Sequence, residues 1–141
     1  DYTAQSTVLT RPFDGIPAVL DALAADGWRM AVCTNKPEEA ARLLLADLGL
    51  ANRFAALGGG DSFPVRKPDP QHLLATLAAA GGSRDRAVMI GDHRNDVQAA
   101  AGAGVPCIFA GWGYGPAHMA DGAPIAATPH DLPRMIAALL A

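Results

Sequence analysis

The stretch Gly91-Asp92-His93-Arg94-Asn95-Asp96 decides the fold of this chain. Four apolar or small residues, 87–90, precede it, and the alanine-rich segment 97–103 follows it. This order predicts a buried strand that ends in a tight turn and continues into a helix. Ligands of parallel α/β sheets bind outside the carboxyl ends of the strands, and paired aspartates there suit a hard cation such as Mg²⁺. The alternative is purely structural: Asp92 stabilises the turn and Asp96 caps the helix.

Composition limits the class of protein. The chain has 141 residues, enough for one domain with a real core. The net charge is −3 and there is no basic run, so we expect no nucleic-acid partner. No apolar stretch reaches the length of a membrane span and no signal peptide is visible. We therefore expect no membrane partner and a cytoplasmic location. Cys33 and Cys107 lie in apolar runs, which predicts buried thiols in a reducing compartment.

Strand-like and helix-like segments alternate along the chain. The expected strands cover residues 28–33, 54–57, 87–90, 105–110 and 125–127. The expected helices begin at Asp14-Gly15, Pro37, Pro70 and Asp96, and a last helix covers residues 130–140. Proline at the start of a helix and glycine just after its end are the usual helix boundaries. Repeated alternation with short connections predicts an α/β fold, in which helices cover both faces of a parallel sheet.

Three polar side chains fall at equivalent places in this pattern. Thr34 follows the strand 28–33, Lys67 ends a long loop just before a helix, and Asp92 follows the strand 87–90. If the strands are parallel, a hydroxyl, an ammonium and a carboxylate converge at one edge of the sheet. Phosphoryl transfer needs such a set, because phosphate oxygens require hydrogen-bond donors, a cation and a carboxylate-bound Mg²⁺.

Three strings resemble the last three of the four motifs of the haloacid dehalogenase (HAD) superfamily. They are Thr34-Asn35-Lys36-Pro37, Lys67-Pro68-Asp69-Pro70 and the 91–96 stretch, in this order. The chain looks most similar to the phosphoglycolate phosphatase branch, over about residues 12 to 120. The resemblance implies a three-layer Rossmann-like core with a parallel sheet flanked by helices.

The same resemblance implies a role for each matching residue. Thr34 would bind the transferring phosphoryl group, and Asn35 would add a main-chain or side-chain donor to it. Lys67 would stabilise the negative charge of nucleophile and phosphate. Asp92 would bind Mg²⁺, and Asp96 would support the metal loop or a metal-bound water rather than bind the ion directly.

One motif of the resembled family is absent. HAD phosphatases carry Asp-x-Asp-Gly-Thr, whose first aspartate is the nucleophile and whose second is the general acid and base. The nearest string here, Pro12-Phe13-Asp14-Gly15-Ile16, has proline at the nucleophile's position, so Asp14 is interpreted as a helix boundary. In the family this motif lies on the central strand, between the strands expected at 28–33 and 87–90. We therefore expect residues 1–13 to be a remnant of a cap or linker and 14–141 an incomplete core of a longer phosphatase, with exposed inner sheet edges.

The resulting hypothesis is a Mg²⁺-dependent phosphomonoester hydrolase that acts through an aspartyl-phosphate. Its partner would be phosphoglycolate or a similar small phosphorylated metabolite, and a homodimer stays open. A sugar-phosphate mutase or another small-phosphate hydrolase stays open, whereas a haloacid dehalogenase would not need Asp92. The alternative from another class is an incomplete fragment or pseudoenzyme that binds phosphate or a protein. A receiver-like or flavodoxin-like module would not need Lys67-Pro68.

Other residues receive structural interpretations. His93 is expected to be peripheral to the metal loop, and His72, His118 and His130 to be surface or helix-start residues. The triple glycine 58–60 lacks the Lys-Ser/Thr of a nucleotide-binding loop and predicts a turn. Trp112 and Tyr114, between glycines, fit either the substrate mouth or loop packing.

Overall fold

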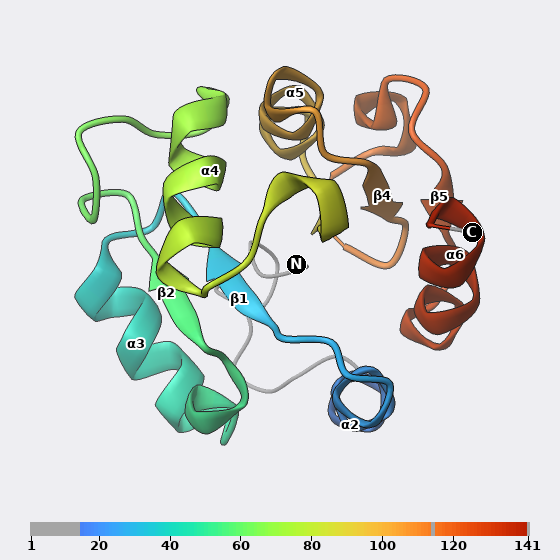
Figure 1. Ribbon diagram of the computed structural model, residues 1–141, viewed down its shortest axis with the longest axis horizontal. Helices are drawn as coiled ribbons and strands as arrows, with labels where there is room; N and C mark the ends of the chain where they lie inside the picture. The colour runs from blue at the N-terminus through green and yellow to red at the C-terminus, as the bar shows by residue number, and fades with distance from the viewer. Residues whose placement is uncertain (1–14, 114, 141) are drawn as a thin grey trace.

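The computed structural model describes residues 15–113 and 115–140, which form an α/β fold of three layers (Figure 1). The strands are β1 (Ala31–Cys33), β2 (Ala56–Gly58), β3 (Met89–Gly91), β4 (Cys107–Ala110) and β5 (Ile125–Ala126). The helices are α2 (Ile16–Ala25), α3 (Glu38–Asp47), α4 (Pro70–Ala79), α5 (Arg94–Ala103) and α6 (Leu132–Leu139). Four 3-10 turns lie between them: η1 (Ala51–Arg53), η2 (Arg84–Arg86), η3 (Ala117–Ala120) and η4 (Pro129–Asp131). The predicted alternation of strands and helices is confirmed.

Within the described residues the strands form two parallel sheets. One sheet pairs β1 with β2, and the other has the order β3-β4-β5. Their registers align Val32 with Leu57, Ile90 with Ile108, and Phe109 with Ile125. The first sheet ends at β1 and the second begins at β3, and these two strands are not paired with each other. The break lies where the sequence predicts a missing central strand.

Both sheets nevertheless share the same two faces. On one face, Val32 and Ile90 belong to a core cluster with residues of α2 and α6. On the other face, Cys33 and Met89 belong to a cluster with residues of α4 and α5. Side chains alternate between the two faces of a strand, so consecutive residues of β1 and of β3 enter opposite layers. In Figure 1, α4 and α5 accordingly lie side by side over one face, while α2 and α6 lie on the other.

The sequence predicts the exact first residue of some helices and is wrong by a few residues for others. Asp69 caps α4 as predicted: its carboxylate accepts a hydrogen bond from the Gln71 main-chain N–H at 2.9 Å. The helix expected from Asp96 instead begins at Arg94, because His93 is the cap and Asp96 lies in the first turn. Both residues make the reciprocal contacts of a capping box, a pattern usually recognised by serine or threonine rather than histidine.

The strands are shorter than the apolar runs that predict them. The run 28–33 becomes paired only from Ala31, and the run 105–110 only from Cys107. Side chains before these points, Trp28, Met30 and Val105, still pack into the core, so hydrophobicity reports burial there and not strand pairing. The expectations for residues 1–13, Asp14 and Tyr114 lie outside the described residues. Among the described helices, none has the length and apolar character needed to cross a membrane.

Candidate active site

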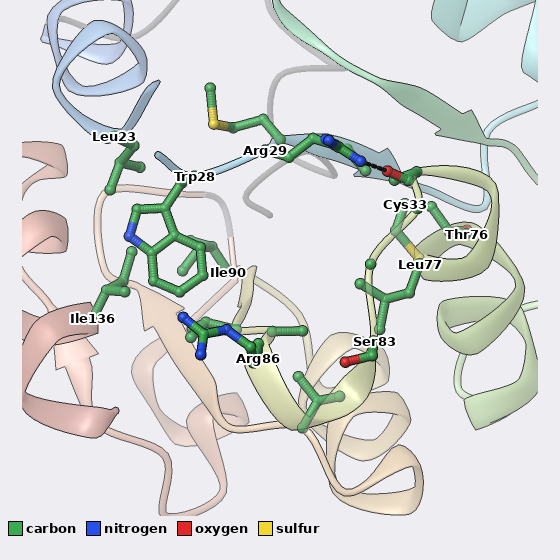
Figure 2. A pocket seen from close by; sticks show the side chains of 18 of the residues that line it. Leu23, Trp28, Arg29, Cys33, Thr76, Leu77, Ser83, Arg86, Ile90 and Ile136 are labelled. Carbon is green, nitrogen blue, oxygen red and sulfur yellow. Dashed lines mark hydrogen bonds between the residues drawn. The ribbon is translucent and has the colours of Figure 1, made fainter. Parts of the chain in front are cut away.

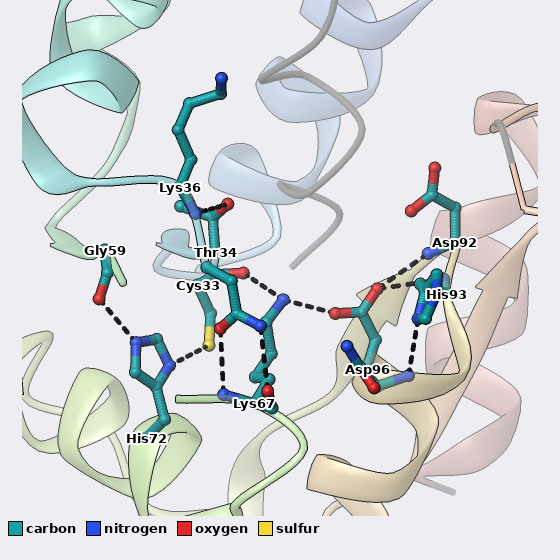
Figure 3. Close-up of polar contacts among 11 residues, drawn as sticks. Cys33, Thr34, Lys36, Gly59, Lys67, His72, Asp92, His93 and Asp96 are labelled. Carbon is teal, nitrogen blue, oxygen red and sulfur yellow. Dashed lines mark hydrogen bonds and ion pairs between the residues drawn. The ribbon is translucent and has the colours of Figure 1, made fainter. Parts of the chain in front are cut away.

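The candidate site lies at the carboxyl ends of β1 and β3, on either side of the break between the two sheets. Thr34 follows β1 directly, and Asp92 follows β3 directly. Lys67 comes from the loop between β2 and α4 and reaches between them, as Figure 3 shows. All three residues are buried, with exposed fractions of 3%, 7% and 5% for Thr34, Asp92 and Lys67 as whole residues. The structure therefore brings the three predicted residues to one edge of the fold.

Lys67 forms a buried ion pair with Asp96. The ammonium of Lys67 donates to the Asp96 carboxylate and to the main-chain carbonyl of Cys33, the latter at 2.8 Å. The side chains of the pair are 3% and 1% exposed. The pair thus connects the end of β1 to the first turn of α5 across the break between the sheets. Because a buried charge without a partner is costly, Asp96 is the residue that allows an ammonium to lie here.

Asp96 also organises the loop that carries Asp92. Its second carboxylate oxygen accepts the main-chain N–H of Asp92 at 3.1 Å and that of His93 at 3.2 Å. Gly91 makes this possible, since a Cβ at that position would lie 2.3 Å from the Asp96 side chain. Asp96 is therefore engaged with Lys67 and with the loop that carries Asp92, and its role in supporting a bound metal stays a prediction.

Asn35 fixes the main chain of Lys67. Its amide nitrogen donates to the Lys67 carbonyl at 2.9 Å, and its amide oxygen accepts the Lys67 N–H at 3.0 Å. This two-point contact holds the Lys67 backbone against the turn after β1 in the way that a neighbouring strand would. The side chain is thus turned toward Lys67, a contact that sequence analysis did not foresee. A phosphate contact from the Asn35 main chain stays a prediction.

Thr34 is oriented by its own turn. Its hydroxyl oxygen accepts the main-chain N–H of Lys36 at 3.1 Å, and its main-chain N–H donates to Gly58 at 2.9 Å. A hydroxyl has one hydrogen and two lone pairs, so after accepting from Lys36 it can still donate its hydrogen to a ligand oxygen. This orientation suits a phosphate oxygen placed over the end of β1.

Two glycines leave room for Asp92. A Cβ on Gly113 would lie 2.6 Å from an Asp92 carboxylate oxygen, and one on Gly115 would lie 1.7 Å from the Asp92 carbonyl. The loop after β4 therefore packs directly on the Asp92 residue, and only glycine permits this approach. Trp112, which lies between Gly111 and Gly113 in the sequence, is half-buried against the core, which favours packing over a role in a substrate mouth. The alternating glycines were the available signal for this contact.

The metal expectation can be tested on the donor set. The described part of the chain holds no group of three His, Cys, Asp or Glu side chains arranged for a metal ion. Mg²⁺, however, is usually bound by one or two carboxylates, with phosphate oxygens and waters completing its octahedron. Asp92 offers such an oxygen ligand at the site, whereas Asp96 is committed to Lys67. The residues present fit a magnesium ion held through Asp92.

A cavity of about 570 Å³ lies below the site, in the break between the sheets (Figure 2). Cys33 of β1 and Ile90 of β3 line it from either side, and Trp28, Leu77 and Arg86 close it further down. This cavity lies where the predicted central strand would run. Among the described residues, the break is therefore a cavity between two strands that belong to the same pair of layers.

Three of the four histidines lie on the surface and one is buried. His118, His130 and His93 are exposed, as expected, and the His93 ring accepts the Asn95 main-chain N–H at 3.0 Å. The surface interpretation of His72 is wrong: it lies in the first turn of α4 but is completely buried. Helical spacing could have revealed it, because His72 precedes the inward-facing Leu73 and lies one turn before the buried Thr76.

Cys33 belongs to the core cluster under α4 and α5, and Cys107 packs against that cluster. Burial raises the pKa of Cys33, although the positive charge of Lys67 opposes this effect. Burial, followed by the negative charge of Asp96, raises the pKa of Cys107 to about 12. Neither residue forms a disulfide. The prediction of buried thiols is confirmed for Cys33, while Cys107 is partly buried.

Comparison with known proteins identifies the family. The sequence profile of the haloacid dehalogenase-like hydrolases matches residues 2–104. The chain belongs to this family. A curated relative from Agrobacterium fabrum, named phosphoglycolate phosphatase, is 48% identical over 113 residues, which are 80% of this chain and 48% of the relative. The chain thus spans about half the length of the curated relatives it matches.

Solved structures agree with the fold. A putative phosphoglycolate phosphatase from Lactobacillus delbrueckii superposes with a TM-score of 0.80 at 32% identity, covering 89% of this chain and 53% of that one. CbbY from Rhodobacter sphaeroides, solved in complex with phosphate, gives a TM-score of 0.77 at 25% identity, covering 86% and 56%. The expected HAD-type Rossmann-like core is therefore confirmed.

Proposed function

We propose that these residues form the phosphate-binding part of a Mg²⁺-dependent phosphomonoesterase. Its substrate would be phosphoglycolate or a similar small phosphorylated metabolite. One observation carries the proposal: Thr34 and Asp92 follow the carboxyl ends of β1 and β3, and the side chain of Lys67 reaches between them at the break between the two sheets. The names of the relatives support phosphoglycolate as the first substrate to test.

In the proposed mechanism the phosphate enters at the open edge above β1 and β3. The Thr34 hydroxyl donates to one phosphoryl oxygen, and the Lys67 ammonium, held by Asp96 and the Cys33 carbonyl, offsets the charge of the others. Bound through Asp92, Mg²⁺ would neutralise further phosphate charge as the reaction proceeds. Lys67 and Asp92 are both buried, so water would weaken little the attraction of the phosphate to the Lys67 ammonium and to a metal ion bound by Asp92.

The nucleophile must come from outside the described residues. The sequence contains no Asp-x-Asp pair, so no local string provides both an attacking carboxylate and a general acid. A strand that filled the 570 Å³ break would end beside Thr34 and Lys67, where an aspartate could attack phosphorus. The P–O ester bond then breaks, the alcohol leaves with a proton from a general acid, and water hydrolyses the aspartyl-phosphate.

A second candidate is a phosphate-binding module without turnover, and the absent Asp-x-Asp pair favours it. The two are separated with protein expressed from the whole reading frame that contains residues 1–141. Phosphate release from 2-phosphoglycolate and a panel of other monoesters is measured with Mg²⁺ and with EDTA. The phosphatase proposal predicts Mg²⁺-dependent release that Asp92→Asn abolishes. Binding of inorganic phosphate without release of phosphate from any monoester would favour the module, and wild-type activity in Asp92→Asn would refute the metal role.

A further inference from the structure

His72 makes two buried contacts that none of the roles above explains. Its ring nitrogens lie 2.7 Å from the Gly59 carbonyl oxygen and 3.3 Å from the Cys33 sulfur, as drawn in Figure 3. The ring also meets the edge of Phe63, with centroids 5.5 Å apart. His72 is 0% exposed, so its ring is completely enclosed by the protein. One imidazole thus joins α4 to the ends of both β1 and β2.

The partners fix the tautomer of the ring. A carbonyl oxygen can only accept, so Nε2 of His72 must carry the hydrogen and donate it to Gly59. Nδ1 is then a lone pair, and it accepts from the thiol of Cys33. Burial lowers the pKa of His72 and raises that of Cys33, which agrees with a neutral imidazole beside a protonated thiol. The contacts thus set the orientation of the ring and favour its neutral form.

Gly59 belongs to a segment, residues 58–62, that packs tightly on the turn after β1; we call it the glycine strap. A Cβ on Gly59 would lie 2.6 Å from the Glu38 nitrogen, and one on Gly60 would lie 2.1 Å from the Asn35 carbonyl. The Gly60 N–H donates to the Lys36 carbonyl at 2.7 Å. The strap is therefore in direct contact with the residues that follow Thr34.

The strap also caps the helix that follows this turn. The carboxylate of Asp61 accepts the Glu38 N–H at 2.8 Å, which satisfies a donor in the first turn of α3. The hydroxyl of Ser62 donates to the Glu38 carboxylate at 2.7 Å and accepts the Gly59 N–H at 2.8 Å. The strap thus contacts His72 through Gly59 and the start of α3 through Asp61 and Ser62. Loss of the His72 contact would leave the strap held only by the contacts on its other side.

The other contact of His72 leads to the lysine. Cys33, whose thiol faces His72, presents its carbonyl to the Lys67 ammonium at 2.8 Å. The same imidazole is therefore linked to two parts of the phosphate site. Through the glycine strap it reaches the turn that carries Thr34, and through Cys33 it reaches the carbonyl that accepts from Lys67.

We propose that His72 is a positioning residue of the phosphate site. Through Gly59 it holds the glycine strap against the Thr34 turn, and through Cys33 it steadies the carbonyl that accepts from Lys67. The inference rests on the proposed phosphatase function and adds to it a residue that touches neither phosphate nor metal. His72 acts through the strap, so its removal loosens the phosphate contacts while the fold survives.

The test uses protein expressed from the whole reading frame and three substitutions. His72→Leu removes both polar contacts and leaves the Gly59 carbonyl buried without its donor. His72→Gln keeps an N–H at the place of Nε2 and so retains the Gly59 contact. Leu20→Ala, in α2 on the opposite face, is the control, because it lowers stability without touching the strap.

We expect His72→Leu to lower kcat/KM by about tenfold or more per folded molecule, since an unsatisfied buried acceptor strains the strap. His72→Gln should stay within about threefold of wild type, and Leu20→Ala should lower the melting temperature with kcat/KM unchanged. The Gly60 amide, bonded to Lys36, should exchange its hydrogen faster in His72→Leu than in Leu20→Ala at matched stability.

Three results would overturn the proposal. They are wild-type kcat/KM in His72→Leu, equal losses in His72→Leu and His72→Gln, or unchanged Gly60 exchange in His72→Leu. Failure of the phosphatase function is recognised separately, because it would appear as no phosphate release by the wild-type protein. In that case the exchange of Gly60 still decides whether His72 holds the strap.

Discussion

The buried pair of Lys67 and Asp96 gives the sharpest prediction on stability. Asp96→Asn removes the negative charge and keeps an oxygen that can still accept from the Asp92 and His93 N–H groups. Lys67→Met removes the positive charge and roughly conserves the volume of the side chain. Each single substitution leaves one buried charge without its counter-ion, whereas the double variant leaves none.

The magnitudes follow from burial and from the remaining contacts. Breaking a buried ion pair costs about 3–5 kcal/mol, and these side chains are at most 3% exposed, so solvent hardly reduces the effect. We expect about 3 kcal/mol for Asp96→Asn, because the stranded Lys67 keeps only the Cys33 carbonyl. We expect about 2 kcal/mol for Lys67→Met, because Asp96 keeps two N–H donors. The double variant should lose about 2–3 kcal/mol in total, well below the sum of the single losses.

The assay is urea unfolding at constant pH and salt, followed by circular dichroism and tryptophan fluorescence. Coincident transitions and equal slopes are required before the free energies of unfolding are compared. Arg42→Met is the control, since Arg42 pairs with Glu38 on the surface with side chains 55% and 39% exposed. It should cost about 0.5 kcal/mol or less. Additive losses in the double variant would refute the buried ion pair.

Three further predictions concern the metal loop and the buried titrating groups. Gly113→Ala should raise the Mg²⁺ concentration for half-maximal activity by about tenfold or more, because the added Cβ would lie 2.5 Å from the Asp92 Cβ. The control Gly82→Ala, whose added Cβ would have its nearest neighbour at 3.6 Å, should leave this concentration unchanged. Equal Mg²⁺ titrations for the two variants would contradict the contact between Gly113 and Asp92. The pKa of His72 is lowered from 6.5 on folding, so in acid the unfolded chain binds more protons than the folded one. The free energy of unfolding, measured with urea, should therefore fall as the pH is lowered below about 6.5. The same dependence of this free energy on pH in His72→Gln would contradict the prediction. The pKa of Cys107 rises on folding from 9.0 to about 12, so above about pH 9 the folded chain keeps a proton that the unfolded chain loses. The free energy of unfolding should therefore fall above about pH 9, and less steeply in Cys107→Ala. An equal loss of stability in both proteins at alkaline pH would show another cause.

The sequence predicts the layers of this fold well because burial and helix boundaries are local properties. The 91–96 stretch, the Asp69 cap and the strand-to-helix alternation each follow from a few neighbouring residues. Strand ends are less predictable, because pairing depends on a neighbour: β1 starts only where it meets β2. The break between the sheets is predicted by a resemblance, since no local signal in residues 28–33 says which strand lies beside them.

The sequence predicts which residues form the candidate site but not the hydrogen bonds that hold them in place. Thr34 and Asp92 are recognisable from their places after strands, and Lys67 from its motif at the end of the loop before a helix. The pairing of Asn35 with the Lys67 main chain joins residues 32 positions apart, and no spacing rule predicts it. The burial of His72 depends likewise on a distant loop, because its donor faces Gly59 and its acceptor faces Cys33.

The most direct test of the site is a crystal structure of the protein from its whole reading frame, with Mg²⁺ and orthovanadate as a phosphate mimic. The account predicts vanadate oxygens within about 3.2 Å of the Thr34 hydroxyl and the Lys67 ammonium. It also predicts a metal ion bound to the Asp92 carboxylate, while Asp96 keeps its contact with Lys67. Vanadate bound away from Thr34 and Lys67, or a metal ion that leaves Asp92 without a bond, would contradict the proposed site.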